Sequence, residues 1–145
     1  MSEKSRPSIF WLFAVLLLPL LSLMAKFNLH DPQKMPKTGP VVIAPNHFTN
    51  IDPIMMGVAV WHLGRLPRFM AKASILCIPV IGWLLLKSGQ IPVERGGSTR
   101  SSVALTQAKA LVTKGRAVIV YPEGSLTRDP EMWPMRGKSG AVRLA

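Results

Sequence analysis

The feature that most constrains the fold is an uncharged apolar segment near the N-terminus. Residues 9–25 read IFWLFAVLLLPLLSLMA and carry no charge, whereas Lys4, Arg6 and Lys26 flank them. At about 1.5 Å per residue, a helix of this length reaches about 25 Å, which is short of the hydrocarbon core of about 30 Å, and Pro19 is expected to kink it. We therefore predict a retained anchor that dips into a bilayer or lies along it.

Two other interpretations of this segment are open. A buried core helix would need apolar partners on every side, which is difficult in a chain of 145 residues. A signal peptide would have similar basic flanks, but no convincing small-x-small cleavage site precedes Lys26. Because basic residues lie on both sides, the sequence predicts no orientation and leaves open whether the helix spans the bilayer.

The charge balance indicates an anionic partner. The chain has 18 Lys and Arg against 7 Asp and Glu, a formal charge of +11, which suits nucleic acid, a membrane surface or a phosphorylated substrate. The basic residues are dispersed and form no module that stacks bases, so we expect no nucleic acid. The single cysteine, Cys77, excludes an internal disulfide and a Cys-rich zinc site, and its apolar neighbours predict that it is buried.

After this segment, short apolar runs alternate with helical patterns. We expect an anchor helix in residues 1–28, a Pro-containing linker in 29–40 and an α/β domain in 41–145, with a mainly parallel sheet flanked by helices. Strands are predicted at 41–44, 67–71, 90–93 and 117–121, and helices at 54–63, 75–86 with an interruption at Pro79 and Gly82, and 98–114. The sequence ends in the opening turns of a helix, which predicts a domain truncated at its C-terminus.

Polar residues follow each predicted strand, and in a parallel sheet they meet at the edge where ligands bind. His47 and Asp52 follow the first strand, five positions apart. A histidine can remove a proton from a hydroxyl when a carboxylate fixes its tautomer and stabilises the imidazolium. The alternative is that Asp52 caps the next helix and His47 is a hydrogen-bonded loop residue.

Three motifs in this order resemble the sequence blocks of the glycerolipid acyltransferases, the group typified by 1-acylglycerol-3-phosphate acyltransferase. The motifs are Asn46-His47-x4-Asp52, GQIPVER at 89–95 and YPEGS at 121–125. The resemblance implies a glycerol-3-phosphate acyltransferase-like fold and transfer of a fatty acyl group from acyl-CoA or acyl carrier protein to a glycerophosphate-type acceptor. The first acceptor to consider is 1-acyl-sn-glycerol-3-phosphate, which would give phosphatidic acid.

The resemblance also implies roles for individual residues. His47 matches the general base, Asp52 its orienting acid, and Arg95 the residue that holds the acceptor phosphate. Glu123, Gly124 and Ser125 match the acceptor-site block. No metal and no cofactor is expected besides the acyl-CoA or acyl-ACP co-substrate, and the partners are membrane lipids and a glycerophosphate or lysophospholipid acceptor. The expected location is the cell membrane, peripheral or single-pass, with the catalytic domain on the cytoplasmic side.

Some assignments have alternatives or depart from the family. Lys72 is a candidate phosphate contact or a solvated surface lysine, and Glu123 is an acceptor contact or the partner of a nearby arginine. The third block commonly continues Glu-Gly-Thr-Arg, whereas Arg128 stands two positions later here, and the proline-rich fourth block is missing. The loop 129–138 is either an exposed loop or the lipid-facing mouth, with Lys138 among its cations.

The chemistry of a thioester agrees with this assignment. A thioester is already activated, so the enzyme needs a base for the attacking hydroxyl and stabilisation of the oxyanion, with no obligatory covalent relay. A guanidinium suits a phosphate. The competing hypothesis is a non-catalytic module that binds lipid or acyl-CoA without releasing CoA.

Overall fold

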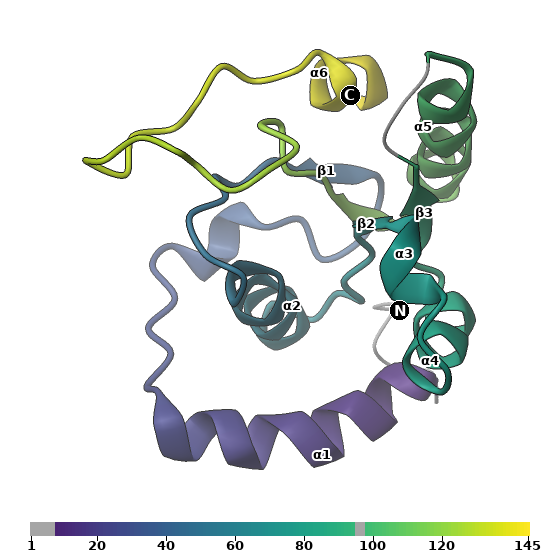
Figure 1. The fold of residues 1–145 in the computed structure, drawn as a ribbon. Coiled ribbons are helices and arrows are strands. Elements are labelled where there is room, and N and C mark those ends of the chain that lie inside the picture. Colours follow the sequence, from purple (N-terminus) through teal and green to yellow (C-terminus); the bar gives the residue numbers. More distant parts are fainter. Residues whose placement is uncertain (1–7, 95–97) are drawn as a thin grey trace.

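Four short parallel strands form the centre of the molecule (Figure 1). The computed structural model describes residues 8–94 and 98–145. Strand β1 (Val41–Ile43) pairs with β4 (Ala117–Ile119), and β2 (Met70–Lys72) pairs with β3 (Ile91–Val93). A parallel bridge between Phe69 and Ile119 joins the two pairs, so β4 lies between β1 and β2. The predicted α/β class with parallel strands is therefore confirmed.

The main core lies between the strands and two C-terminal helices, α5 (Ser98–Thr113) and α6 (Gly140–Leu144). Val118 and Val120 of the central strand region are buried with Ala104 and Ala108 of α5. Alanines on the helix allow it to approach the strands closely. Because side chains alternate along a strand, Ile119 faces the opposite side, where α2 (Asp52–His62) lies (Figure 1).

The N-terminal helix α1 (Ile9–Met24) packs on this second side of the molecule. Phe10 is buried with Trp61 of α2 and with Leu66, but Leu16 is 64% exposed and Leu23 is 86% exposed. The interpretation as a core helix is therefore wrong, because much of the apolar surface of α1 remains uncovered. Within residues 8–94 and 98–145, no helix combines the length and apolar character needed to cross a membrane.

The predicted helix at 75–86 is divided into α3 (Ala73–Leu76) and α4 (Ile81–Lys87). The chain turns at Val80, whose φ is +64°, and Gly82 then lies so close to the Leu76 carbonyl that a Cβ would overlap it. Cys77 lies in this turn and is exposed, so the prediction that it is buried is wrong. Apolar neighbours in sequence did not bury it, because the turn itself presents apolar side chains to the surface.

The remaining elements begin or end within a few residues of their predicted bounds. Strand β2 begins at Met70 rather than Pro67, and a proline lacks the N–H that a strand ladder uses. Strand β4 ends at Ile119, although the Val120 N–H still donates to the Ile43 carbonyl at 2.9 Å. The segment predicted as a linker contains one turn of 3-10 helix, η2 (Pro32–Lys34).

Arg65 connects this linker to the domain. Its side chain is completely buried, and its guanidinium donates to the carbonyls of Pro36 at 2.8 Å, Gly39 at 2.7 Å and Gly115 at 2.9 Å. Gly115 terminates α5 with a φ of +72°, so one cation joins the linker to the turn before β4. Buried carbonyls need such donors, because an unpaired polar group is costly to remove from water.

We predict that Arg65→Met lowers the free energy of unfolding by on the order of 3 kcal/mol, because three carbonyls lose a charged donor. Urea denaturation measures this change. The exposed Lys114→Met is the matched control and should change stability by less than about 0.5 kcal/mol. Equal effects of the two substitutions would contradict this role of Arg65.

Candidate active site

The carboxyl ends of the strands lie at one edge of the sheet, because all four strands are parallel. The loop after β1 carries His47, and the turn after β4 carries Glu123. These two strands are direct neighbours, so the two segments meet. The topology therefore brings together two motifs that are 76 residues apart in sequence.

Asp52 organises the loop that carries His47. One carboxylate oxygen, Oδ2, accepts the Phe48 N–H at 2.6 Å and the Thr49 N–H at 2.8 Å, and it lies 3.2 Å from His47 Nδ1. The other, Oδ1, accepts the Thr49 hydroxyl at 2.7 Å. Asp52 is the first residue of α2 and makes no cap bond to that helix. The interpretation as a helix cap is thus wrong, since the carboxylate turns back to the loop.

This environment fixes the charge of Asp52. Burial acts to raise the pKa of the carboxyl, but the hydrogen bonds from Thr49, His47 and Phe48 together outweigh it and lower the pKa below 3.8. Asp52 is therefore a carboxylate at neutral pH and can only accept a hydrogen bond. A neutral His47 then carries its proton on Nδ1, which leaves Nε2 as the basic nitrogen. Among the described residues, Nε2 has no hydrogen-bond partner.

Glu123 holds the backbone of His47. The side chain is only 6% exposed, and its Oε1 accepts the His47 N–H at 3.0 Å while Oε2 accepts the Met135 N–H at 2.9 Å. The Thr127 N–H donates in turn to the His47 carbonyl at 2.8 Å. Within the described parts of the chain Glu123 forms no ion pair, so the arginine-pairing interpretation finds no support. A direct contact of Glu123 with an acceptor stays a prediction.

Tyr121 is a site residue to which the sequence analysis gave no role. Its ring stacks on the His47 imidazole, with centroids 4.2 Å apart and planes 26° apart. Burial and the nearby Asp52 carboxylate raise the pKa of Tyr121, so the phenol is neutral. Its place at the start of the YPEGS motif was the available signal, but stacking depends on the pairing of β1 with β4. Thr49 was missed for a similar reason, since it acts only through Asp52.

The turn after Tyr121 places a lysine beside the site. Gly124 has a φ of +70°, and a Cβ at this position would lie 3.0 Å from Lys138 Nζ. The Lys138 N–H donates to the Pro122 carbonyl at 2.8 Å, which anchors the lysine there. Arg128 is exposed and Ser125 is partly exposed. The backbone conformation thus favours glycine at 124, and a side chain there would also displace the end of Lys138.

The sequence analysis also assigned Lys72 and Arg95 to the site. Lys72 ends β2 and is exposed at the start of α3. Arg95 follows β3 in sequence and lies outside the described residues. The assignment of either residue to a phosphate stays a prediction.

Comparison with known proteins agrees with this geometry. A model of the acyltransferase family matches residues 26–145. The chain belongs to the acyltransferase family. The match includes the loop of His47 and Asp52 and the turn of Glu123. The predicted membership of the glycerolipid acyltransferases is supported by the curated relatives that the chain resembles.

Three curated relatives show which kinds of acyltransferase the chain resembles. The chain is 30% identical to a chloroplastic 1-acyl-sn-glycerol-3-phosphate acyltransferase of Brassica napus, over 83% of this chain and 33% of the relative. It is 28% identical to the human beta form of that enzyme, over 83% of this chain and 42% of the relative. It is also 28% identical to a lyso-ornithine lipid O-acyltransferase of Pseudomonas aeruginosa, over 72% of this chain and 38% of the relative. The chain therefore spans between 33% and 42% of these relatives.

We predict that Glu123→Gln destabilises the protein by on the order of 2 kcal/mol. A glutamine offers one acceptor oxygen, so either the His47 or the Met135 N–H loses its partner and faces an amide donor. Thermal and urea unfolding measure the loss. The exposed Glu131→Gln removes the same charge and should leave stability nearly unchanged. If the two variants were equally stable, the proposed bridging role would be wrong.

The lowered pKa of Asp52 predicts an acid-dependent stability. Because the folded-state pKa lies below the unfolded value of 3.8, the contribution of Asp52 is fully present above that value and is lost as the pH falls through the folded-state pKa. The stability difference between the wild type and Asp52→Asn should therefore shrink as the pH falls below about pH 4. Urea denaturation at a series of pH values tests it, and a difference that does not shrink below about pH 4 would contradict it.

Proposed function

We propose that the protein is a membrane-associated acyltransferase that moves a fatty acyl group to a hydroxyl of a glycerophosphate-type acceptor. The observation that carries the proposal is the arrangement of His47. Its Nδ1 faces the Asp52 carboxylate at 3.2 Å, its ring stacks on Tyr121 and its backbone is held by Glu123. This is the arrangement that a general base for a hydroxyl requires.

The proposed reaction starts from a thioester, either acyl-CoA or acyl-ACP. Nε2 of His47 accepts the proton of the acceptor hydroxyl as its oxygen attacks the thioester carbonyl. The resulting tetrahedral intermediate collapses, the carbon–sulfur bond breaks, and the leaving thiolate takes up the proton from Nε2, which returns His47 to its neutral form. Asp52 stabilises the imidazolium during the step, and Tyr121 restricts the tilt of the ring. No side chain needs to form a covalent intermediate.

The cations near this edge of the sheet suit a phosphate-bearing acceptor. Lys138 lies against Gly124, and Lys72 ends a neighbouring strand. We include Arg95 on the strength of its motif alone. The names of the Brassica and human relatives support 1-acyl-sn-glycerol-3-phosphate as the acceptor, and that of the Pseudomonas relative makes a lyso-ornithine lipid the second acceptor to test.

The decisive experiment measures thiol release from acyl-CoA and acyl-ACP with each acceptor, on the whole protein in phospholipid–detergent micelles. His47→Gln, which keeps a polar side chain of similar size, should lower the rate by about 10²- to 10⁴-fold, the usual contribution of a general base. The exposed His30→Ala should leave the rate unchanged.

Two outcomes would contradict the proposal. One is a folded His47→Gln protein with the full rate of acyl transfer. The other is a wild type that binds acyl-CoA but releases no thiol with any acceptor, which would identify a non-catalytic binding module.

A further inference from the structure

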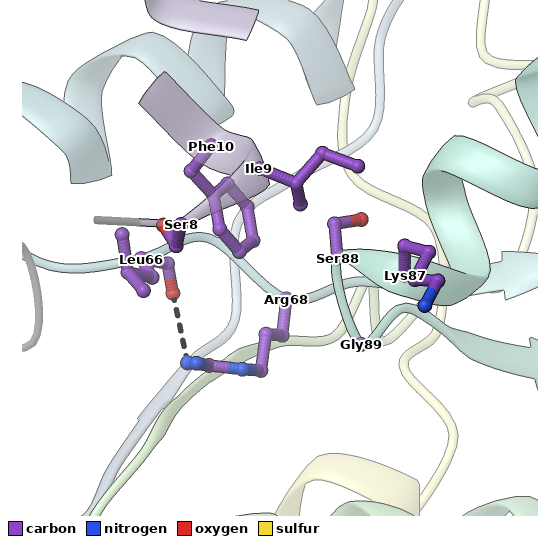
Figure 2. A pocket seen from close by; sticks show the side chains of 8 residues that line it. All are labelled: Ser8, Ile9, Phe10, Leu66, Arg68, Lys87, Ser88 and Gly89. Atoms are coloured by element: carbon purple, nitrogen blue, oxygen red, sulfur yellow. Dashed lines mark hydrogen bonds between the residues drawn. The ribbon is translucent and has the colours of Figure 1, made fainter. Parts of the chain in front are cut away.

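A pocket lies at the other edge of the sheet, at the opposite ends of the strands from His47. It has a volume of about 430 Å³ and is lined where α1 begins, where α4 ends and before β2 (Figure 2). Arg68 and Gly89 line it and precede β2 and β3 in sequence. The pocket is therefore at the amino ends of these strands, whereas the candidate active site is at the carboxyl ends. The pocket is thus separate from the candidate active site.

Two cationic side chains, Arg68 and Lys87, line this pocket. Arg68 is only 8% exposed, its guanidinium donates to the Leu66 carbonyl at 3.3 Å and lies 5.9 Å from the centre of the Phe10 ring. Lys87 lines the other side of the pocket (Figure 2), with its ammonium 6.0 Å from the centre of the Trp83 ring. No aspartate or glutamate is among the described residues that line the pocket.

Ser8 adds an independent observation. Its hydroxyl oxygen is buried at the pocket and, within the described residues, has no hydrogen-bond partner. It is the residue before α1, yet its side chain makes no cap bond to that helix. A buried hydroxyl without a partner is unusual, because removing it from water is costly. The two cationic side chains that line the pocket, Arg68 and Lys87, match the acceptor oxygens of a phosphate.

The surroundings of the pocket indicate which phosphate it takes. On α1, beside Ser8, Trp11 is 45% exposed and Leu12 is 49% exposed. On α4, beside Lys87, Trp83 is 58% exposed and Leu86 is 56% exposed. Apolar side chains that flank a cationic pocket match the boundary between acyl chains and head groups, where tryptophan and lysine are favoured. A soluble phosphate would make no use of these apolar surfaces.

We propose that this pocket binds the phosphate of an anionic phospholipid, while the exposed apolar side chains of α1 and α4 enter the lipid around it. The inference rests on the membrane association in the proposed function, but not on the catalytic chemistry. The lipid is here a structural ligand that seats the protein, not the acyl acceptor. The pocket thereby fixes two helices, rather than one, at the bilayer surface.

Sedimentation with vesicles tests the proposal on the whole protein. Vesicles of phosphatidylcholine alone are compared with vesicles that also contain phosphatidylglycerol. Lys87→Gln removes a pocket cation, and Ser8→Asp places a carboxylate in the pocket while keeping a residue that is favoured before a helix. Each should weaken partitioning to the anionic vesicles by about fivefold and leave partitioning to phosphatidylcholine unchanged.

The control is Lys114→Gln, which removes the same unit of charge from an exposed residue at the end of α5. It should weaken anionic partitioning by less than about twofold. Equal losses for Lys87→Gln and Lys114→Gln would overturn the pocket and leave only the net charge of the protein. A wild type that partitions to the anionic vesicles no better than to phosphatidylcholine vesicles would overturn the lipid assignment.

Thiol release in detergent micelles is measured on the same variants and should be unchanged. This assay separates the two proposals. An inactive wild type with intact vesicle preference would contradict the proposed function alone, and an active enzyme without that preference would contradict the pocket alone.

Discussion

The site depends on one carboxylate that is shared between two loops. Glu123 accepts one N–H from the loop after β1 and one from the segment at Met135, with a single oxygen for each. Both bonds are charge-assisted, and the side chain is nearly completely buried, so neither amide has water as an alternative partner. The backbone of His47 is therefore fixed before Asp52 acts on its ring. His47 is thus held from two sides by two carboxylates, Glu123 at its backbone and Asp52 at its ring.

The strand pattern of the fold was predictable, but the lengths of the elements were less so. Apolar β-branched runs between prolines placed β1 and β4, because such runs are typical of buried strands. The break between α3 and α4 was expected from Pro79 and Gly82, whereas the positive φ falls on Val80. The apolar neighbours of Cys77 in the sequence also led to a wrong prediction, because Cys77 is exposed. Burial depends on what covers a residue, and no sequence neighbour reports that.

In the candidate site, too, some features were predictable from the sequence and others were not. The spacing of His47 and Asp52 indicated a hydrogen-bonded pair, and the structure brings them together. The spacing contained no information on the backbone amides that Asp52 also binds, because these depend on the conformation of the loop. The stacking of Tyr121 and the position of Lys138 depend on contacts between segments far apart in sequence. Residue types at fixed spacing thus predict the reacting groups better than the groups that position them.

For the proposed reaction, the order of the strands sets a length scale for the acceptor. Three steps between neighbouring strands separate the carboxyl end of β1 from that of β3, which is about 14 Å at the usual spacing of paired strands. The proposed base, His47, follows β1 and the proposed phosphate contact, Lys72, ends β2, so the pairing of the strands sets the distance between them. An acceptor whose hydroxyl and anionic group are spaced to reach both would be held in line. In the proposed reaction, selectivity among acceptors would then depend on molecular span, which the backbone pairing sets.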